Sequence, residues 1–107
     1  MSSDTLFTVH VEETGSTLLG TLVGELDMLT EPDLVAALGS ALETTTATSC
    51  VLDLRQVAFM DSSGLRAVIV CSEQAKARGI DFSLVVEPGP VTRLLDVAGV
   101  RSWFSYG

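Results

Sequence analysis

The residue types that could carry chemistry meet in a polar turn at residues 61–64, of sequence DSSG. The turn follows an apolar run that is typical of a buried strand. A pattern with the helical spacing i, i+3, i+4 and i+7 starts directly after it, at Leu65, Val68, Ile69 and Ser72. The sequence therefore predicts that a strand passes into a helix here, with Ser62 or Ser63 as the N-cap.

The start of a helix favours negative charge. Its first backbone N–H groups have no partner within the helix, and the helix dipole makes this end partly positive. A phosphate placed there would be stabilised by the backbone itself. We therefore interpret Ser62 as a hydroxyl that can carry a phosphoryl group and lose it again. Serine is also among the commonest N-caps, so a plain cap without further function is the alternative that the spacing leaves open.

Other chemistries lack the residues that they need. A serine hydrolase requires a base, yet the G-x-S-x-G pattern is missing and the single histidine, His10, is remote in sequence from Ser62. We expect His10 on the exposed face of a strand and not in a metal site. Neither GxxxxGK[ST] nor GxGxxG occurs, so no nucleotide-binding loop of those kinds is predicted. The spacing of Asp27, Asp53 and Asp61 does not require a magnesium site, and we expect neither a metal nor a cofactor.

Length and composition indicate a single domain over residues 1–107, with 47% hydrophobic residues to build a core. The net charge of −8 argues against nucleic acid or an anionic membrane as partner, and it permits a protein partner with a basic face. No apolar run reaches 18 residues, and residues 1–5 lack the features of a signal peptide, so a cytoplasmic location is expected. Cys50 and Cys71 lie in apolar segments and are interpreted as reduced core thiols.

The pattern of strands predicts an α/β fold. Two strands over 6–12 and 17–23 form an antiparallel hairpin, and further strands follow over 50–54 and 80–86. A last short strand is possible over 100–104, where Trp103 and Phe104 would be core or lid residues. Because a hairpin is followed by βαβ units, we expect a mixed sheet of four to five strands with three to four helices packed over it.

Three helices are predicted between these strands. The first begins at Thr30, where Thr30 and Asp33 resemble a weak capping box. Its buried stripe consists of Leu34, Leu38, Ala41 and Leu42. The second is the helix after the turn, and it ends at Gly79. The third begins at Pro90 and ends at Gly99, and its inner stripe consists of Val91, Leu94, Leu95 and Ala98.

Two motifs of the chain point to one family. Residues 59–65, of sequence FMDSSGL, closely resemble the signature of STAS domains, which occur in anti-sigma factor antagonists and in the cytoplasmic tails of sulphate transporters. Residues 24–27, of sequence GELD, resemble the segment that such antagonists carry at the end of their second strand. The resemblance covers about residues 5–104 and implies the STAS fold. Without a transmembrane segment, the free-standing antagonists are the better match.

The resemblance also implies a function based on partner switching. Such a protein, when unphosphorylated, binds an anti-sigma factor and makes it release its sigma factor. The anti-sigma factor is commonly a serine kinase of the GHKL ATPase type, and it phosphorylates the serine that follows the aspartate of the motif, here Ser62. Ser63 is the second candidate acceptor, and a serine phosphatase restores the active form. The chain itself would not be an enzyme, and we expect a monomer or a weak dimer.

Residues around the two motifs are expected to contact the partner. They are Asp27, Met28, Leu29, Met60, Asp61, Ser63, Gly64 and Arg66. Met28, Leu29 and Met60 would either form an apolar docking patch or cover the core, and Asp27 would either orient Ser62 or be an ordinary turn residue. Arg66 departs from the small residue of many antagonists, which leaves the partner surface open. The alternative functions are a non-switching STAS module, acting as a scaffold or binding a small ligand, and, as the weakest, a small hydrolase using Ser62.

Overall fold

The computed structural model describes residues 7–107. The start of the predicted first strand at residue 6, and the segment 1–5, lie outside the described residues. The elements are β1 (Thr8–Thr14), β2 (Thr17–Leu26), α1 (Glu31–Thr44), β3 (Ser49–Met60), α2 (Ser62–Ala77), β4 (Asp81–Val85), α3 (Pro90–Ala98), a 3-10 helix η2 (Arg101–Trp103) and β5 (Ser105–Tyr106).

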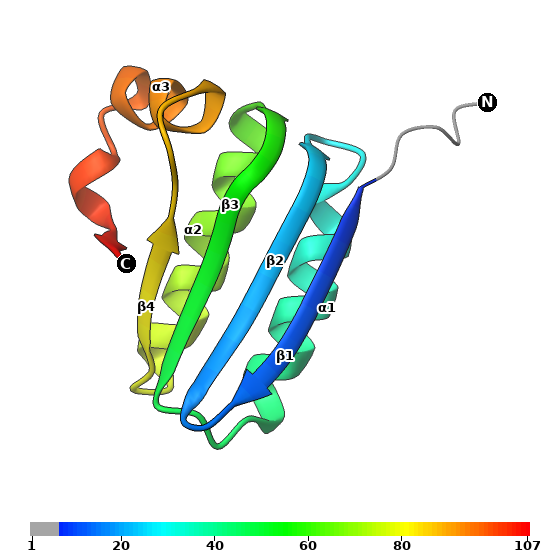
Figure 1. Cartoon of the computed structure of the whole chain (residues 1–107), viewed down its shortest axis with the longest axis vertical. Coiled ribbons are helices and arrows are strands. Elements are labelled where there is room, and N and C mark those ends of the chain that lie inside the picture. The colour runs from blue at the N-terminus through cyan, green and yellow to red at the C-terminus, as the bar shows by residue number, and fades with distance from the viewer. Residues whose placement is uncertain (1–6) are drawn as a thin grey trace.

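The strands form one mixed sheet with the order β1-β2-β3-β4-β5 (Figure 1). β1 pairs antiparallel with β2, and every later pair is parallel. The predicted hairpin and mixed α/β sheet are therefore confirmed. Because β2, β3 and β4 run in parallel, their carboxyl ends meet at one edge of the sheet, which we call the carboxyl edge.

Helices α1 and α2 lie side by side on the same face of the sheet, behind it in the view of Figure 1. Leucines from the strands and from α1 fill the space between these layers; Leu22, Leu26, Leu34, Leu38, Leu52 and Leu84 are at most 1% exposed. Helix α3 instead packs beside the end of β3, at the carboxyl edge. The core thus fixes the ends of β2 and β3 and the start of α2 relative to one another.

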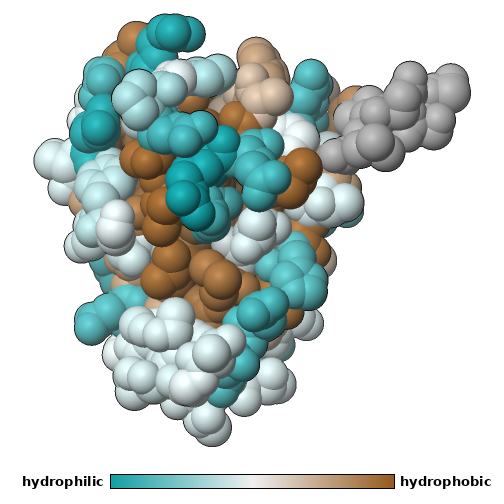
Figure 2. Space-filling model, viewed as in Figure 1, coloured by the Kyte–Doolittle hydropathy of each residue, from teal (hydrophilic) through white to brown (hydrophobic). Residues whose placement is uncertain are grey.

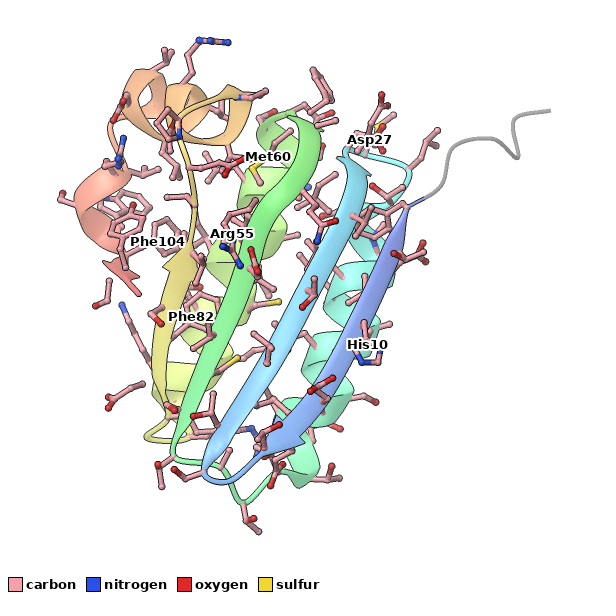
Figure 3. All side chains as sticks on the ribbon, viewed as in Figure 1. His10, Asp27, Arg55, Met60, Phe82 and Phe104 are labelled. Atoms are coloured by element: carbon pink, nitrogen blue, oxygen red, sulfur yellow. The ribbon has the colours of Figure 1, made fainter. Side chains whose placement is uncertain are left out.

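Side chains on the opposite face of the sheet alternate with those of the core. Leu19, Val51 and Val85 lie on this face, because each is next to a core residue on its strand and successive side chains point to opposite faces. All three are half-buried. Figure 2 shows apolar side chains in the middle of this face, bordered by polar ones. His10 lies on β1, where its side chain is 71% exposed and its Nε2 bonds to Glu12 (Figure 3). The expectation of an exposed strand histidine is confirmed.

Two predicted details of the helices are wrong. Thr30 does precede α1, but its hydroxyl does not cap that helix; it donates a hydrogen bond to the carbonyl oxygen of Glu25 at 2.7 Å. In α3, Val91 and Leu95 are buried whereas Ala98 is exposed, because the helix ends there. The polar Thr92 is buried instead, and its hydroxyl accepts a hydrogen bond from the N–H of Gly89.

The predicted strand over 100–104 is also wrong. Residues 101–103 form the 3-10 helix, and only Ser105 and Tyr106 pair with β4. Phe104 is buried and Trp103 is 56% exposed, so the first belongs to the core and the second does not. A three-residue helix cannot be distinguished from a strand by the spacing of its apolar residues, because three residues are too few to show a repeat.

The two cysteines are buried free thiols, as predicted. Burial raises the pKa of Cys50 to about 11 and that of Cys71 to about 12, because a thiolate would lose its hydration there. In the described part of the chain, the helices are too short or too polar to cross a membrane.

Candidate functional site

The turn at residues 61–64 lies at the carboxyl edge, between the end of β3 and the start of α2. The N-cap of α2 is Asp61, so the prediction of Ser62 or Ser63 as the cap is wrong. Asp61 has an extended backbone, and its Oδ1 accepts a hydrogen bond from the N–H of Gly64 at 3.0 Å. The Asp61 carbonyl oxygen accepts the first helical bond, from the N–H of Leu65. Aspartate and serine can both accept a hydrogen bond from a free N–H at the helix start. Only aspartate also places a negative charge at the positive end of the helix.

Gly64 sits against the end of β2. The Asp61 N–H donates to the carbonyl oxygen of Leu26 at 3.3 Å, which draws the start of α2 onto that strand. A Cβ atom added to Gly64 would lie 2.3 Å from the same oxygen. Gly64 is buried and its role in the structure is this close approach, so it offers a partner little surface.

The two serines of the turn differ in exposure. Ser62 is the first residue of α2 and is exposed, whereas Ser63 is half-buried. Since Asp61 caps the helix, neither hydroxyl is used as a cap, and within residues 7–107 neither donates or accepts a side-chain hydrogen bond. The Ser62 hydroxyl is therefore the more accessible of the two, at the positive end of a helix of 16 residues.

Asp27 organises the neighbouring turn at the end of β2. Its Oδ1 accepts hydrogen bonds from the N–H groups of Leu29 and Thr30 at 3.0 and 3.1 Å. Its own N–H donates to the Thr30 hydroxyl at 2.9 Å. Within the described chain, no hydrogen bond joins Asp27 to Ser62, so the structure supports the turn role that the sequence left open. Figure 3 shows Asp27 at the same edge of the sheet as Met60.

Gly24 also shapes the backbone of the GELD segment. It has a φ of 112°, a conformation that side chains rarely allow, next to an irregularity in the pairing of β2 with β3. The glycine and the aspartate of GELD thus both shape the end of β2.

The apolar residues around the turns separate into two groups. Met28 and Leu29 are 67% and 81% exposed, as a docking patch requires. Met60 is 5% exposed and belongs to the core, which was the other alternative. Arg66 is exposed, one turn beyond Ser62 on α2. The structure therefore brings Met28, Leu29 and Arg66 to the surface of the carboxyl edge, and it withdraws Met60.

Charge is unevenly distributed along the chain. All six Lys and Arg residues lie at position 55 or later, whereas nine of the fourteen carboxylates precede it. Since β1, β2 and α1 come from the first part, their side of the molecule has carboxylates without any lysine or arginine. Glu25, Asp27, Glu31 and Asp33 lie at this side of the carboxyl edge, and Asp61 adjoins them. The surroundings of Ser62 are therefore acidic before any modification.

Asp53, one of the three aspartates considered for a magnesium site, is bound by Arg55 on β3. Arg55 donates from Nε to Oδ1 at 3.0 Å and from Nη2 to Oδ2 at 2.8 Å. These bonds hold the pKa of Asp53 below its ordinary value, although burial opposes this by raising it. Among the described residues, no group of three or more His, Cys, Asp or Glu side chains could hold a metal ion.

A groove that the sequence patterns do not predict lies at the carboxyl edge, between the end of β3 and α3. We call it the α3 groove; it is lined by Phe59, Met60, Pro90, Arg93, Leu94 and Val97. Val97 is 81% exposed and Phe59 is 47% exposed. The sequence signal for this groove is Val97, an apolar residue on the outer side of the predicted amphipathic helix.

Comparisons with known proteins agree with this architecture. The model of the STAS domain family matches residues 8–106. An anti-sigma F factor antagonist from Paenibacillus polymyxa is 29% identical over 92 residues, which cover 86% of this chain and 79% of the relative. The crystal structure of an anti-sigma factor antagonist from Mycobacterium paratuberculosis has a TM-score of 0.85 and 25% identity, covering 99% of this chain and 89% of that one.

The fold is also that of the anti-sigma factor antagonist SpoIIAA. Its unphosphorylated form superposes with a TM-score of 0.78 at 22% identity, covering 94% of this chain and 88% of that one. The Bacillus SpoIIAA in its phosphorylated form superposes with a TM-score of 0.70 at 24% identity, covering 94% and 91%. Together with the family match over nearly all of the described residues, the sheet order and the turn geometry show that the chain belongs to the STAS domain family.

Proposed function

We propose that the chain is an anti-sigma factor antagonist that is switched by phosphorylation of Ser62. The unphosphorylated form binds an anti-sigma factor, which then releases its sigma factor. The anti-sigma factor is a serine kinase of the GHKL ATPase type, and it inactivates the antagonist by phosphorylating Ser62. A serine phosphatase reverses the modification. The chain acts by binding and is not itself an enzyme.

The observation that carries this proposal is the state of the Ser62 hydroxyl. It is exposed at the first position of α2, and Asp61 performs the capping that would otherwise occupy it. A kinase can therefore reach the hydroxyl without unfolding the helix start. The N-terminal N–H groups and the dipole of α2 then stabilise the phosphate that is formed.

Similar proteins support the same role. The Paenibacillus polymyxa relative is an anti-sigma F factor antagonist, and the Mycobacterium paratuberculosis structure is an anti-sigma factor antagonist. Both likenesses extend over most of this chain. The finer parts of the proposal, which are the phosphoacceptor, the kinase class and the phosphatase, rest on the geometry of the turn and on the family resemblance.

The acidic surroundings of Ser62 explain how the two forms can be told apart. Phosphorylation adds about −1.5 to −2 charges at neutral pH. In this position the new charge joins that of Asp27 and Asp61 at an edge where Arg66 is the nearest cation along the chain. A partner surface that fits the bare hydroxyl would have to bury this charge while offering no cation to pair with it, which is strongly unfavourable. The switch therefore acts at the contact surface and does not require refolding.

The proposal is tested with the purified anti-sigma factor of the same organism. With ATP, the wild-type chain should gain the mass of one phosphate, and Ser62→Ala should not. Ser62→Asp should weaken binding at least tenfold, whereas Ser40→Asp adds the same charge at an exposed position of α1 and should leave binding unchanged. Calorimetry or surface plasmon resonance gives the affinities.

Two results would contradict the proposal. If the phosphate is found on Ser63, both in the wild type and in Ser62→Ala, then Ser63 and not Ser62 is the phosphoacceptor. Tight binding without any phosphate transfer by an active kinase would instead indicate a non-switching STAS module that acts as a scaffold.

A further inference from the structure

Exposed apolar side chains gather at the carboxyl edge, on both sides of Ser62. Met28 and Leu29 follow β2, while Phe59 at the end of β3 and Val97 on α3 border the α3 groove. These four are 47% to 81% exposed. Large apolar side chains that are exposed together in one region indicate a surface that another protein covers.

The α3 groove is a shallow, mostly apolar depression. It has a volume of about 290 Å³, and five of its six lining residues are apolar. Met60 is buried and Leu94 half-buried, so they form its floor, whereas Phe59 and Val97 rise at its borders. Pro90 fixes the start of α3 beside it. An apolar side chain placed there would cover Leu94 and the exposed sides of Phe59 and Val97.

The groove is continuous with the turn that carries Ser62. Phe59 and Met60, which line it, are the residues directly before Asp61. Only Met60 and Asp61 lie between Phe59 and Ser62, so the Cα atoms of Phe59 and Ser62 are at most about 11 Å apart. A protein that contacts the Ser62 hydroxyl therefore reaches the groove with the same surface.

The charges next to the two groups of apolar residues differ. Asp27, Glu31 and Asp33 surround Met28 and Leu29, whereas Arg93 lines the α3 groove and forms no ion pair with any described residue. A basic region of a partner would complement the first side, and a carboxylate would complement Arg93 at the second. This asymmetry permits one orientation of the partner across the edge.

We propose that the α3 groove is a second contact site for the anti-sigma factor, which inserts an apolar side chain there and pairs a neighbouring carboxylate with Arg93. This rests on the proposed function and adds to it: Ser62 reports the phosphorylation state, while the groove supplies affinity and orientation. Since Phe59, Leu94 and Val97 do not touch the phosphoacceptor, their contribution is separate from the charge on Ser62.

The test compares charged variants of α3 for binding to the purified anti-sigma factor. Val97→Asp places a carboxylate in the groove and should weaken binding at least tenfold. Ala98→Asp makes the same change at the next residue of the helix, outside the groove, and should change binding less than threefold. Arg93→Glu should also weaken binding about tenfold, whereas Arg93→Lys should restore most of the affinity. Since Val97, Arg93 and Ala98 are exposed, all four variants should fold, and circular dichroism verifies this.

The outcomes separate the groove from the phosphorylation switch. If Ser62→Asp abolishes binding while Val97→Asp and Arg93→Glu bind like the wild type, the groove proposal is overturned and the switch stands. If the wild type does not bind the anti-sigma factor, both are overturned. A dimer of the wild type that Val97→Asp dissociates, seen in sedimentation, would assign the groove to a second copy of the chain and would also overturn the proposal.

Discussion

Gly64 and Leu26 meet at the point where α2 begins against the end of β2. A Cβ atom on Gly64 would lie 2.3 Å from the Leu26 carbonyl oxygen and 2.9 Å from Leu26 Cγ. The nearest atom belongs to the backbone of a strand in the core, so it cannot move aside as a side chain could. The position of the Ser62 hydroxyl therefore depends on having a glycine, without a side chain, at position 64.

We predict that Gly64→Ala destabilises the fold by at least about 2 kcal/mol, because a methyl group would force the start of α2 away from β2. Gly39→Ala is the matched control. Gly39 lies inside α1, and its added Cβ would be 3.4 Å from the flexible Gln74 side chain. Replacing a glycine inside a helix should then be neutral or stabilise by about 0.5–1 kcal/mol. Urea denaturation of both variants gives the comparison, and equal stabilities would contradict the prediction.

Removing the cap of α2 should have a smaller effect. Asp61→Ala leaves the N–H of Gly64 without its acceptor, and the loss should be about 1 kcal/mol in the free energy of unfolding. Asp61→Asn keeps an acceptor oxygen and should be nearly as stable as the wild type. Urea midpoints measure both variants. An unchanged stability of Asp61→Ala would show that a serine hydroxyl takes over the cap, and Ser62 would then be less available to a kinase.

Arg66 should interact with a phosphate on Ser62 within the same helix. The two exposed residues are four positions apart, with the acidic group on the N-terminal side, which is the favourable orientation. A nearby cation stabilises the dianion, so Arg66→Gln should raise the second pKa of the phosphoserine above its value in the wild-type phosphoprotein. Arg66→Lys should restore it. A phosphorus-31 NMR titration reads the pKa directly, and identical curves for all three proteins would exclude the pairing.

The Asp53–Arg55 pair should contribute to stability at neutral pH and lose that contribution in acid. The pKa of folded Asp53 is lowered by its bonds to Arg55, whereas the unfolded chain has the ordinary value near 3.9. The stabilisation is therefore present above about pH 4 and disappears as the pH falls through the lower, native value. Arg55→Gln should be less stable than the wild type at pH 7, and the difference should shrink at pH 3.

Arg101→Gln is the control for this measurement. Its exposed pair with Asp96 should contribute little at either pH. Urea midpoints of the three proteins at pH 7 and pH 3 decide the question. A difference between wild type and Arg55→Gln that is the same at both pH values would assign the effect to packing of the arginine.

The cysteines should resist alkylation as long as the chain is folded. With pKa values of about 11 and 12, Cys50 and Cys71 are almost entirely protonated at pH 8, and both are buried. Iodoacetamide at pH 8 should label neither thiol in the folded protein within an hour, and both within minutes in urea, as mass spectrometry can show. Rapid labelling of the folded protein would contradict the prediction, and it would show local opening at β3 if Cys50 reacts or at α2 if Cys71 reacts.

The main elements were predictable because their patterns are long and regular. The strand before the DSSG turn, the helix after it and the leucine stripe of α1 each follow from periodicity alone. What periodicity could not supply was the cap of α2. Serine and aspartate are both good caps, and the choice of Asp61 depends on the close contact of α2 with Leu26, which brings together residues that are far apart in the sequence.

The candidate site was predicted in part for the same reason. Ser62 and its neighbours follow from one continuous motif. By contrast, the burial of Met60 and the α3 groove result from packing α3 against the end of β3, and no local pattern describes that contact. The exposed Val97 was visible as an irregularity in the sequence of α3, but only the fold shows that it stands beside Phe59.

Nine carboxylates and no lysine or arginine precede position 55, whereas the rest of the chain is nearly neutral, so the folded chain has an asymmetric charge distribution and an electric dipole moment. In the field of a basic partner the molecule experiences a torque before contact, which turns the side formed by β1, β2 and α1 forward. Productive collisions should then become more frequent at low ionic strength, and added salt should slow association far more than it speeds dissociation. The association rate would thus depend on charged residues far from Ser62, whereas phosphorylation of Ser62 would end the binding.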